Sequence, residues 1–236
     1  LGYGNALAQP YHHVILPLAS RRDKVTEVRW GIRDFQRRFG RDPEGMWLPE
    51  TAVDHETLEV LAQEGIRFTV LSPHQVTAPP PHGRPGRWQH NGHELAIFCY
   101  DGPLAHDIAF SDVLRDAHGW HRRIAEVPMA DDGVTICSVA TDGETFGHHH
   151  RQGDLALASL IDRLERDPEG RCTTFATILA DHPPMHDVTL VERTAWSCPH
   201  SLGRWQHDCG CRMNGGSSQA WRAPLRNGLQ QLADGI

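Results

Sequence analysis

Short apolar runs alternate with segments of helical periodicity along most of this chain, and that alternation limits the folds open to it. The apolar runs have the length of buried strands and occupy residues 46–48, 66–71, 95–100, 134–139 and, more weakly, 188–191. The helix-like segments are residues 23–39, 54–65, 110–124, 154–166, 175–181 and 220–233. Strands alternating with helices over 236 residues predict an α/β fold with parallel strands, either a barrel or a doubly wound sheet.

Charge and composition argue against several classes of partner. The chain carries 30 Asp and Glu against 23 Lys and Arg, a net charge of −7 with no basic block. We therefore expect neither nucleic acid nor a membrane surface as a partner, and no apolar run reaches the roughly 20 residues of a membrane span. Six cysteines are too few for a disulfide scaffold at this length, so a reducing, cytoplasmic location is expected.

Two acidic residues stand at comparable places, each just after a predicted strand. Asp142 follows the run 134–139, and Glu50 follows the run 46–48. The carboxyl ends of parallel strands converge on one face of a barrel, so the two carboxylates are expected to share a cleft. Such a pair suits glycoside hydrolysis. One carboxylate attacks the sugar or stabilises its developing positive charge, and the other protonates the leaving oxygen.

Aromatic side chains supply the flat apolar faces on which sugar rings stack. Those available are Trp47, Trp196, Trp205 and Trp221. Packing in the core is the alternative explanation for any one of them.

Four segments, in this order along the chain, resemble motifs of glycoside hydrolase family 57. Within the family the resemblance is to a subgroup of bacterial proteins. The four segments are residues 11–18 (Tyr-His-His-Val-Ile-Leu-Pro-Leu), 45–50 (Gly-Met-Trp-Leu-Pro-Glu), 141–148 (Thr-Asp-Gly-Glu-Thr-Phe-Gly-His) and 194–197 (Thr-Ala-Trp-Ser). The resemblance covers most of the chain. It implies a distorted (β/α)7-type barrel of the kind shared by glycoside hydrolases and deacetylases, formed by residues 1–236 as a single, partial catalytic domain. The family's first motif, His-Gln-Pro, is not visible, so we expect the first strand of the barrel to be missing from this chain.

The resemblance also assigns roles to individual residues. Glu50 matches the nucleophile and Asp142 the general acid/base, with retention of configuration, no metal or other cofactor, and an α-glucan or oligosaccharide as substrate. The activity implied is that of an amylase, a 4-α-glucanotransferase or a branching enzyme. The side chains expected to contact sugar are His13, Trp47, His148 and Trp196. Either histidine could instead orient a carboxylate or a loop.

A cysteine-rich stretch near the end of the chain admits several interpretations. Cys198, His200, Cys209 and Cys211 have the chemistry of a tetrahedral zinc site, although their spacing is not that of a standard zinc motif. A disulfide or redox pair is the second interpretation. Packing in a loop beside the active-site mouth is the third, and it is the one we expect.

Two other functions remain open on the sequence. In a metal-dependent polysaccharide deacetylase or mannosidase, Asp142 with His148 or His150 would bind a divalent ion that activates water. A metal on Asp142 would favour this alternative, whereas the Trp-Leu-Pro-Glu segment ending at Glu50 argues against it. A non-catalytic glycan-binding domain is the other alternative, and it predicts sugar binding without turnover.

Overall fold

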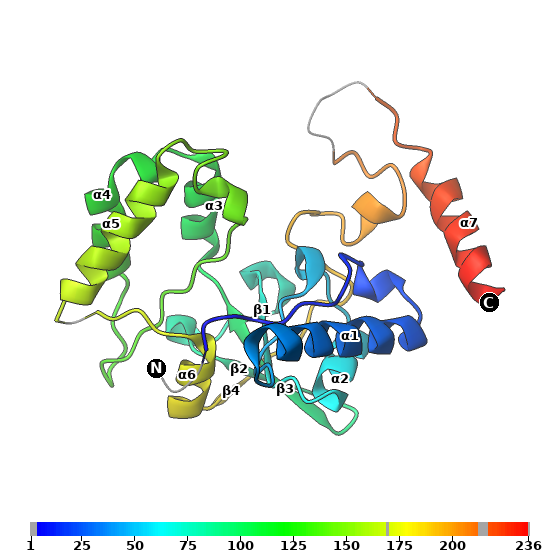
Figure 1. Ribbon diagram of the computed structural model, residues 1–236, viewed down its shortest axis with the longest axis horizontal. Helices are drawn as coiled ribbons and strands as arrows, with labels where there is room; N and C mark the ends of the chain where they lie inside the picture. Colours follow the sequence, from blue (N-terminus) through cyan, green and yellow to red (C-terminus); the bar gives the residue numbers. More distant parts are fainter. Residues whose placement is uncertain (1–3, 169, 212–216, 236) are drawn as a thin grey trace.

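A computed structural model describes residues 4–168, 170–211 and 217–235, and it shows a mixed α/β fold built on a four-stranded sheet (Figure 1). The strands are β1 (Phe68–Leu71), β2 (Gly86–His90), β3 (His93–Cys99) and β4 (His186–Asp187), in the order β1-β3-β2-β4. β1 pairs with β3 in parallel, β2 with β3 antiparallel, and β4 with β2 in parallel. The helices in the described part of the chain are α1 (Arg21–Phe39), α2 (His55–Gln63), α3 (Gly102–Phe110), α4 (Ala117–Ala125), α5 (Gly153–Arg166), α6 (Phe175–Asp181) and α7 (Arg222–Asp234).

Single parallel bridges extend the sheet beyond β1. Gly45 bridges to Phe68, and Met46 bridges in turn to Ala8. The strand expected at 46–48 is therefore one bridged step rather than a ladder, but it lies where a parallel neighbour of β1 belongs. It delivers the chain to Glu50 at the carboxyl end of the sheet.

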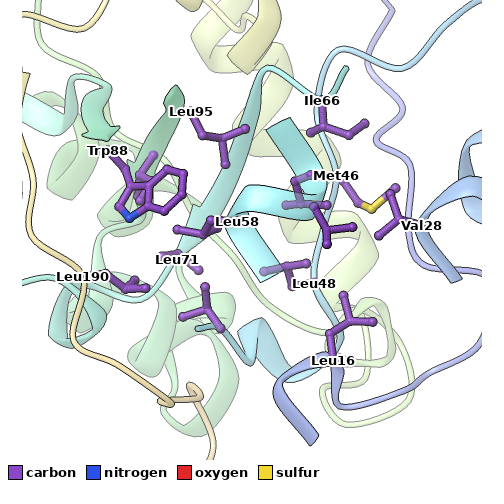
Figure 2. Packing of buried hydrophobic residues seen from close by; sticks show 14 of the residues in the cluster. Leu16, Val28, Met46, Leu48, Leu58, Ile66, Leu71, Trp88, Leu95 and Leu190 are labelled. Atoms are coloured by element: carbon purple, nitrogen blue, oxygen red, sulfur yellow. The ribbon is translucent and has the colours of Figure 1, made fainter. Parts of the chain in front are cut away.

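The parallel pair β1 and β3 is buried on both faces, along all of β1 and from Leu95 onward in β3, as the strands of parallel sheets usually are. Along β3, Leu95 and Ile97 point to the face covered by α1 and α2, while Phe98 points to the opposite face. Figure 2 shows the first of these clusters, to which Trp88 of β2, Leu95 of β3 and Leu58 of α2 all belong. Alternate side chains of one strand thus support two cores, one on each side of the sheet.

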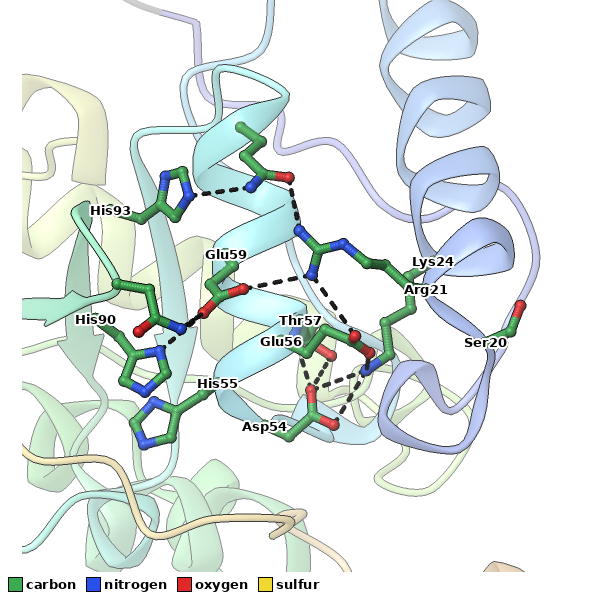
Figure 3. Close-up of polar contacts among 12 residues, drawn as sticks. Ser20, Arg21, Lys24, Asp54, His55, Glu56, Thr57, Glu59, His90 and His93 are labelled. Carbon is green, nitrogen blue, oxygen red and sulfur yellow. Dashed lines mark hydrogen bonds and ion pairs between the residues drawn. The ribbon is translucent and has the colours of Figure 1, made fainter.

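Helices α1 and α2 are joined by a buried ion pair (Figure 3). The Nζ of Lys24 lies 3.1 and 3.2 Å from the two carboxylate oxygens of Asp54, and 2.6 Å from Glu56. Asp54 also caps α2, because its carboxylate accepts from the backbone N–H of Thr57 at 2.8 Å. Only 1% of Lys24 is exposed, so its charge depends on these partners.

The main departure from the predicted alternation is a β-hairpin. β2 was not expected, and it turns into β3 through Asn91 and Gly92, whose φ angles are 48° and 78°. Positive φ at two successive residues is the type I′ turn that Asn-Gly favours.

The helix expected at 110–124 is wrong as a single element. α3 ends at Phe110, and α4 begins only at Ala117, where the Asp116 carboxylate accepts from the N–H groups of His118 and Gly119. A capping aspartate inside the predicted span starts a new helix there. The helices expected at 23–39, 54–65, 154–166, 175–181 and 220–233 are confirmed to within a few residues.

The strands expected at 134–139 and 188–191 are also wrong as ladders. Residues 134–139 belong to no helix or strand and make isolated backbone bonds, from Ile136 N to His82 O and from Asp101 N to Ser138 O. Near the second run, β4 ends at Asp187 and Leu190 forms only a bridge to Val76. The named strands form an open sheet of four, so the α/β class is confirmed and closure into a barrel stays a prediction. None of the helices described here has the length and apolar composition to cross a membrane.

Candidate active site

Glu50 lies on a strained turn at the end of the segment that passes β1. Glu50 and Thr51 both adopt left-handed backbone conformations, with φ angles of 57° and 48°. Residues other than glycine avoid this region, β-branched threonine most of all, at a cost of order 1–3 kcal/mol each. A turn of this kind persists only where its surroundings hold it.

Gln75 supplies much of that support. The Thr51 hydroxyl donates to Gln75 Oε1 at 2.8 Å, and Gln75 Nε2 donates back to the Thr51 carbonyl oxygen at 2.8 Å. Gln75 also accepts from the Ser72 N–H at 2.9 Å and donates to the Thr194 hydroxyl at 3.3 Å. Gln75 and Thr51 are both completely buried, so these bonds replace all the water that the two side chains lose.

Two hydrogen-bond donors hold the Glu50 carboxylate, and both bind the same carboxylate oxygen. Its Oε2 accepts from Trp196 Nε1 at 3.1 Å and from the Ser197 hydroxyl at 2.5 Å. Its Oε1 lies 3.6 Å from His13 Nε2, and 27% of the Glu50 side chain is exposed. The backbone N–H of Trp196 donates to the carbonyl oxygen of Glu50 and to the Thr51 hydroxyl, each at 3.1 Å. The arrangement fixes the carboxylate plane and leaves the side chain accessible.

Aromatic rings border Glu50. Trp47 and Trp196 meet edge to face with ring centroids 5.2 Å apart, and Tyr100 meets Trp196 at 6.3 Å. Both tryptophans are half-buried, so each packs into the core and keeps part of its ring at the surface. Burial raises the pKa of Tyr100, and its hydrogen bond with Ser72 opposes part of that rise.

Asp142 follows the irregular segment 134–139 and is exposed. Ala140 packs against the same buried cluster as Trp47 and Trp196, so the backbone leading to Asp142 passes along the aromatic side of the sheet. The carbonyl oxygen of Asp142 accepts from the N–H of Thr145 at 3.0 Å, which begins a short 3-10 turn. That Asp142 and Glu50 share one cleft stays a prediction.

His148 lies in the exposed loop after Asp142. Its Nδ1 is 3.0 Å from Glu144 Oε2, and both side chains are largely exposed. Glu144, His148 and His149 are close enough to share an ion, but all three are exposed, which is common without a metal. Among the described residues, Asp142 belongs to no group with the spacing of metal ligands.

The cysteine-rich stretch folds back on itself. Cys198, His200, Cys209 and Cys211 bring one ligand atom each to within 4.8 Å of one another. Cys198 is buried, and the other three lie near the surface. The loop packing expected from the sequence therefore does not describe this segment fully, because its four metal-binding side chains converge.

Comparison with known proteins assigns the chain to a family. The model of glycosyl hydrolase family 57 matches residues 2–190. The chain belongs to this family. It is 22% identical over 204 residues to an α-amylase of Pyrococcus horikoshii, covering 80% of this chain and 31% of the relative. It is 22% identical over 203 residues to a 4-alpha-glucanotransferase of Thermococcus litoralis, covering 80% and 30%. This family 57 chain thus spans about a third of the length of these relatives.

Solved structures agree on the fold. An exo-type maltose-forming amylase of a Pyrococcus species superposes with a TM-score of 0.80 at 15% identity, over 96% of this chain and 44% of the other. A structure described as a polysaccharide deacetylase from Mycobacterium smegmatis superposes with a TM-score of 0.59 at 14% identity, over 79% and 66%. At these identities the likeness concerns the fold alone. The fold is similar both to that of an amylase and to that of a deacetylase.

Two residues that support Glu50 were not predicted from the sequence. Ser197 holds Glu50, and its place beside Trp196 in the matched segment 194–197 was the available signal. Gln75 lies in the proline-rich stretch 73–85, where no pattern marks it, because its role depends on a partner 24 residues away.

Proposed function

We propose that this family 57 chain carries the catalytic carboxylates of a retaining enzyme that hydrolyses or transfers α-glucans. The observation that carries the proposal is the Glu50 carboxylate. It lies on a strained turn that is held by hydrogen bonds to Gln75. One of its oxygens accepts from Trp196 and Ser197, and half-buried aromatic rings lie beside it. The α-amylase and 4-alpha-glucanotransferase among the relatives support an α-glucan as substrate.

In the proposed reaction Glu50 is the nucleophile. Two donors occupy Oε2 and orient the carboxylate, so Oε1, beside His13, attacks the anomeric carbon. Asp142 gives its proton to the departing glycosidic oxygen as the bond to the anomeric carbon breaks, and a glycosyl-enzyme ester forms on Glu50. Asp142 then takes a proton from water or from an incoming sugar hydroxyl, which displaces Glu50 and restores the starting configuration.

The remaining predicted side chains bind substrate in this proposal. Trp47 and Trp196 offer ring faces to the sugar, and His148 extends from the loop after Asp142. We further propose that the sheet belongs to a distorted (β/α)7-type barrel. The parallel succession from Ala8 through Met46 to β1 and β3 supports it.

Azide rescue distinguishes the two carboxylates. The substrate is an aryl α-maltooligosaccharide, whose leaving group departs without acid assistance. Glu50→Ala with azide is expected to yield a β-configured glycosyl azide, because azide attacks the sugar directly. Asp142→Ala with azide is expected to yield the α-configured azide, because azide intercepts the ester on Glu50.

The anomeric configuration of the first product from the unaltered protein, followed by proton NMR, is the companion measurement. An inverted product would contradict the proposal, as would turnover that survives Glu50→Gln. Equal glucan binding by the unaltered protein and Glu50→Gln, with turnover by neither, would instead favour a glycan-binding domain.

A further inference from the structure

The structure gathers three thiols and one imidazole at a single point. The sulfur of Cys198 lies 3.9 Å from that of Cys209 and 3.8 Å from that of Cys211. His200 Nδ1 lies 3.3 Å from the Cys211 sulfur, and all four ligand atoms fall within 4.8 Å of one another. We propose that these four side chains bind one zinc ion.

The separations match the edges of a zinc tetrahedron. A zinc–sulfur bond of about 2.3 Å at the tetrahedral angle places two sulfurs about 3.8 Å apart. A disulfide requires about 2.05 Å instead. The Cys198 sulfur stands at the tetrahedral distance from two other thiols at once, which a disulfide pair would not need.

The backbone is shaped for this convergence. Gly210, between Cys209 and Cys211, has a φ angle of +86°, which L side chains rarely adopt. A Cβ at Gly203 would lie 2.9 Å from the Cys209 Cβ, so only glycine lets the two arms of the loop approach closely. Two glycines thus permit the close approach of these side chains, whose spacing in the sequence is not that of a standard zinc motif.

Four protein ligands leave no open coordination position, so the proposed ion is structural. Its binding replaces three S–H protons, which pass to solvent, with three zinc–thiolate bonds, and neutral His200 supplies the fourth ligand. The zinc is therefore no part of the glycosidase chemistry, for which we expect no cofactor, and its presence is independent of the roles proposed for Glu50 and Asp142.

The ion has a consequence for the active site. Cys198 directly follows Trp196 and Ser197, both of which donate to Glu50. Zinc bound there ties the Cys209–Cys211 segment to residues 196–198 and so fixes the donors that orient the carboxylate. Cys198 is only 2% exposed, so it is the buried ligand of the set.

Metal content of the purified chain, expressed in zinc-supplemented medium under reducing conditions, tests the proposal. We expect one zinc per chain in the unaltered protein and in Cys172→Ser, which removes an exposed thiol outside the cluster. Cys198→Ser and Cys211→Ser are expected to lose the metal.

A second measurement, cobalt binding, keeps the proposal testable if those variants fail to fold. Cobalt added to the metal-free, unaltered protein is expected to give the intense visible absorption of tetrahedral thiolate coordination. His200→Cys, which supplies a fourth thiolate, is expected to keep one metal and strengthen the sulfur-to-cobalt charge-transfer band. Absence of both zinc and a tetrahedral cobalt spectrum would overturn the proposal, as would a disulfide among these cysteines or equal metal loss in Cys172→Ser.

Discussion

Thr51 and Gln75 form a reciprocal pair, in which the hydroxyl of Thr51 donates to the Gln75 carboxamide and that carboxamide donates back to the Thr51 carbonyl oxygen. Neither residue touches water. The pair holds a left-handed backbone at the residue next to Glu50. The position of the proposed nucleophile is therefore fixed by Gln75, whose side chain is completely buried behind it.

Gln75→Leu is expected to release this turn. Buried hydrogen-bonding groups on Thr51 would lose their partners, so the free energy of unfolding should fall by about 1–3 kcal/mol. Activity should fall mainly in kcat, because Glu50 loses its position. Urea denaturation and glucan kinetics measure the two effects. The exposed Gln89→Leu is the control, with a stability change of no more than about 0.5 kcal/mol. Equal effects from both substitutions would contradict the role given to Gln75.

Ser197→Ala removes one of the two donors to Glu50 Oε2. A hydrogen bond to a charged group contributes about 1.5–3 kcal/mol. Since Glu50 is partly exposed, we expect the lower end and a decrease in kcat of about tenfold. Ser197→Thr keeps the hydroxyl and should retain most of the activity. Trp196→Phe combined with Ser197→Ala should be non-additive, since both act on one oxygen. Unchanged kinetics in Ser197→Ala would show that the bond plays no part in turnover.

Glu59 links stability to pH. Burial acts to raise the pKa of Glu59, but hydrogen bonds from His90, Asn91 and Arg21 together hold it below the usual value (Figure 3). A carboxylate with a lowered pKa in the folded state stabilises the fold above the unfolded value, about 4.3 for glutamate. That stabilisation is lost as the pH falls through the folded-state pKa.

Glu59→Gln should therefore be less stable than the unaltered protein at pH 7. The difference should shrink once the pH is below the folded-state pKa, as urea denaturation across pH 3 to 7 would show. The exposed Glu126→Gln provides the control, with a change below about 0.5 kcal/mol. A deficit of constant size over the whole range would mean that Glu59 acts through packing alone.

The six cysteines should fall into three classes of reactivity. Burial raises the pKa of Cys99 to about 12 and, together with the nearby Asp101, that of Cys137 to about 11. At pH 8 both remain thiols and should resist iodoacetamide until the protein unfolds. Exposed Cys172 should be alkylated first.

The three cysteines of the proposed zinc site should react only after a chelator removes the ion. Peptide mass spectrometry before and after chelation resolves the classes. Early alkylation of Cys209 or Cys211 without a chelator would count against bound zinc, whereas early alkylation of Cys99 would count against the described core.

The sequence predicted helices better than strands. Val28 and Phe35 recur at helical spacing and form the buried face of α1 as expected. Residues 134–139 looked like a strand because they are apolar and β-branched, but those properties report burial, and the segment is largely half-buried without forming a ladder. The strand β2 has few apolar residues, although Trp88 within it is almost fully buried. Its signal was the Asn-Gly turn that follows it.

The candidate site was predictable where it lay inside the short segments that resemble family motifs, such as 45–50 and 194–197. Glu50 and Trp196 were chosen from two such segments, and the structure joins them by a hydrogen bond. The proposed zinc ligands Cys198, His200, Cys209 and Cys211 were named from the sequence as one alternative, although loop packing was expected there. Gln75 was not predicted, because its role depends on contacts with residues 24 and 119 positions away. Local pattern carries no information about such long-range contacts.

The ion pair between Lys24 and Asp54 has a practical consequence for anyone handling the protein. Lys24 is the only lysine in the sequence, and its amine is enclosed between α1 and α2. Amine-directed crosslinkers, dyes and coupling resins therefore find no side-chain target on the folded protein. Acquisition of such a label at Lys24 would report that the two helices had separated, so the residue can serve as a built-in probe of local opening.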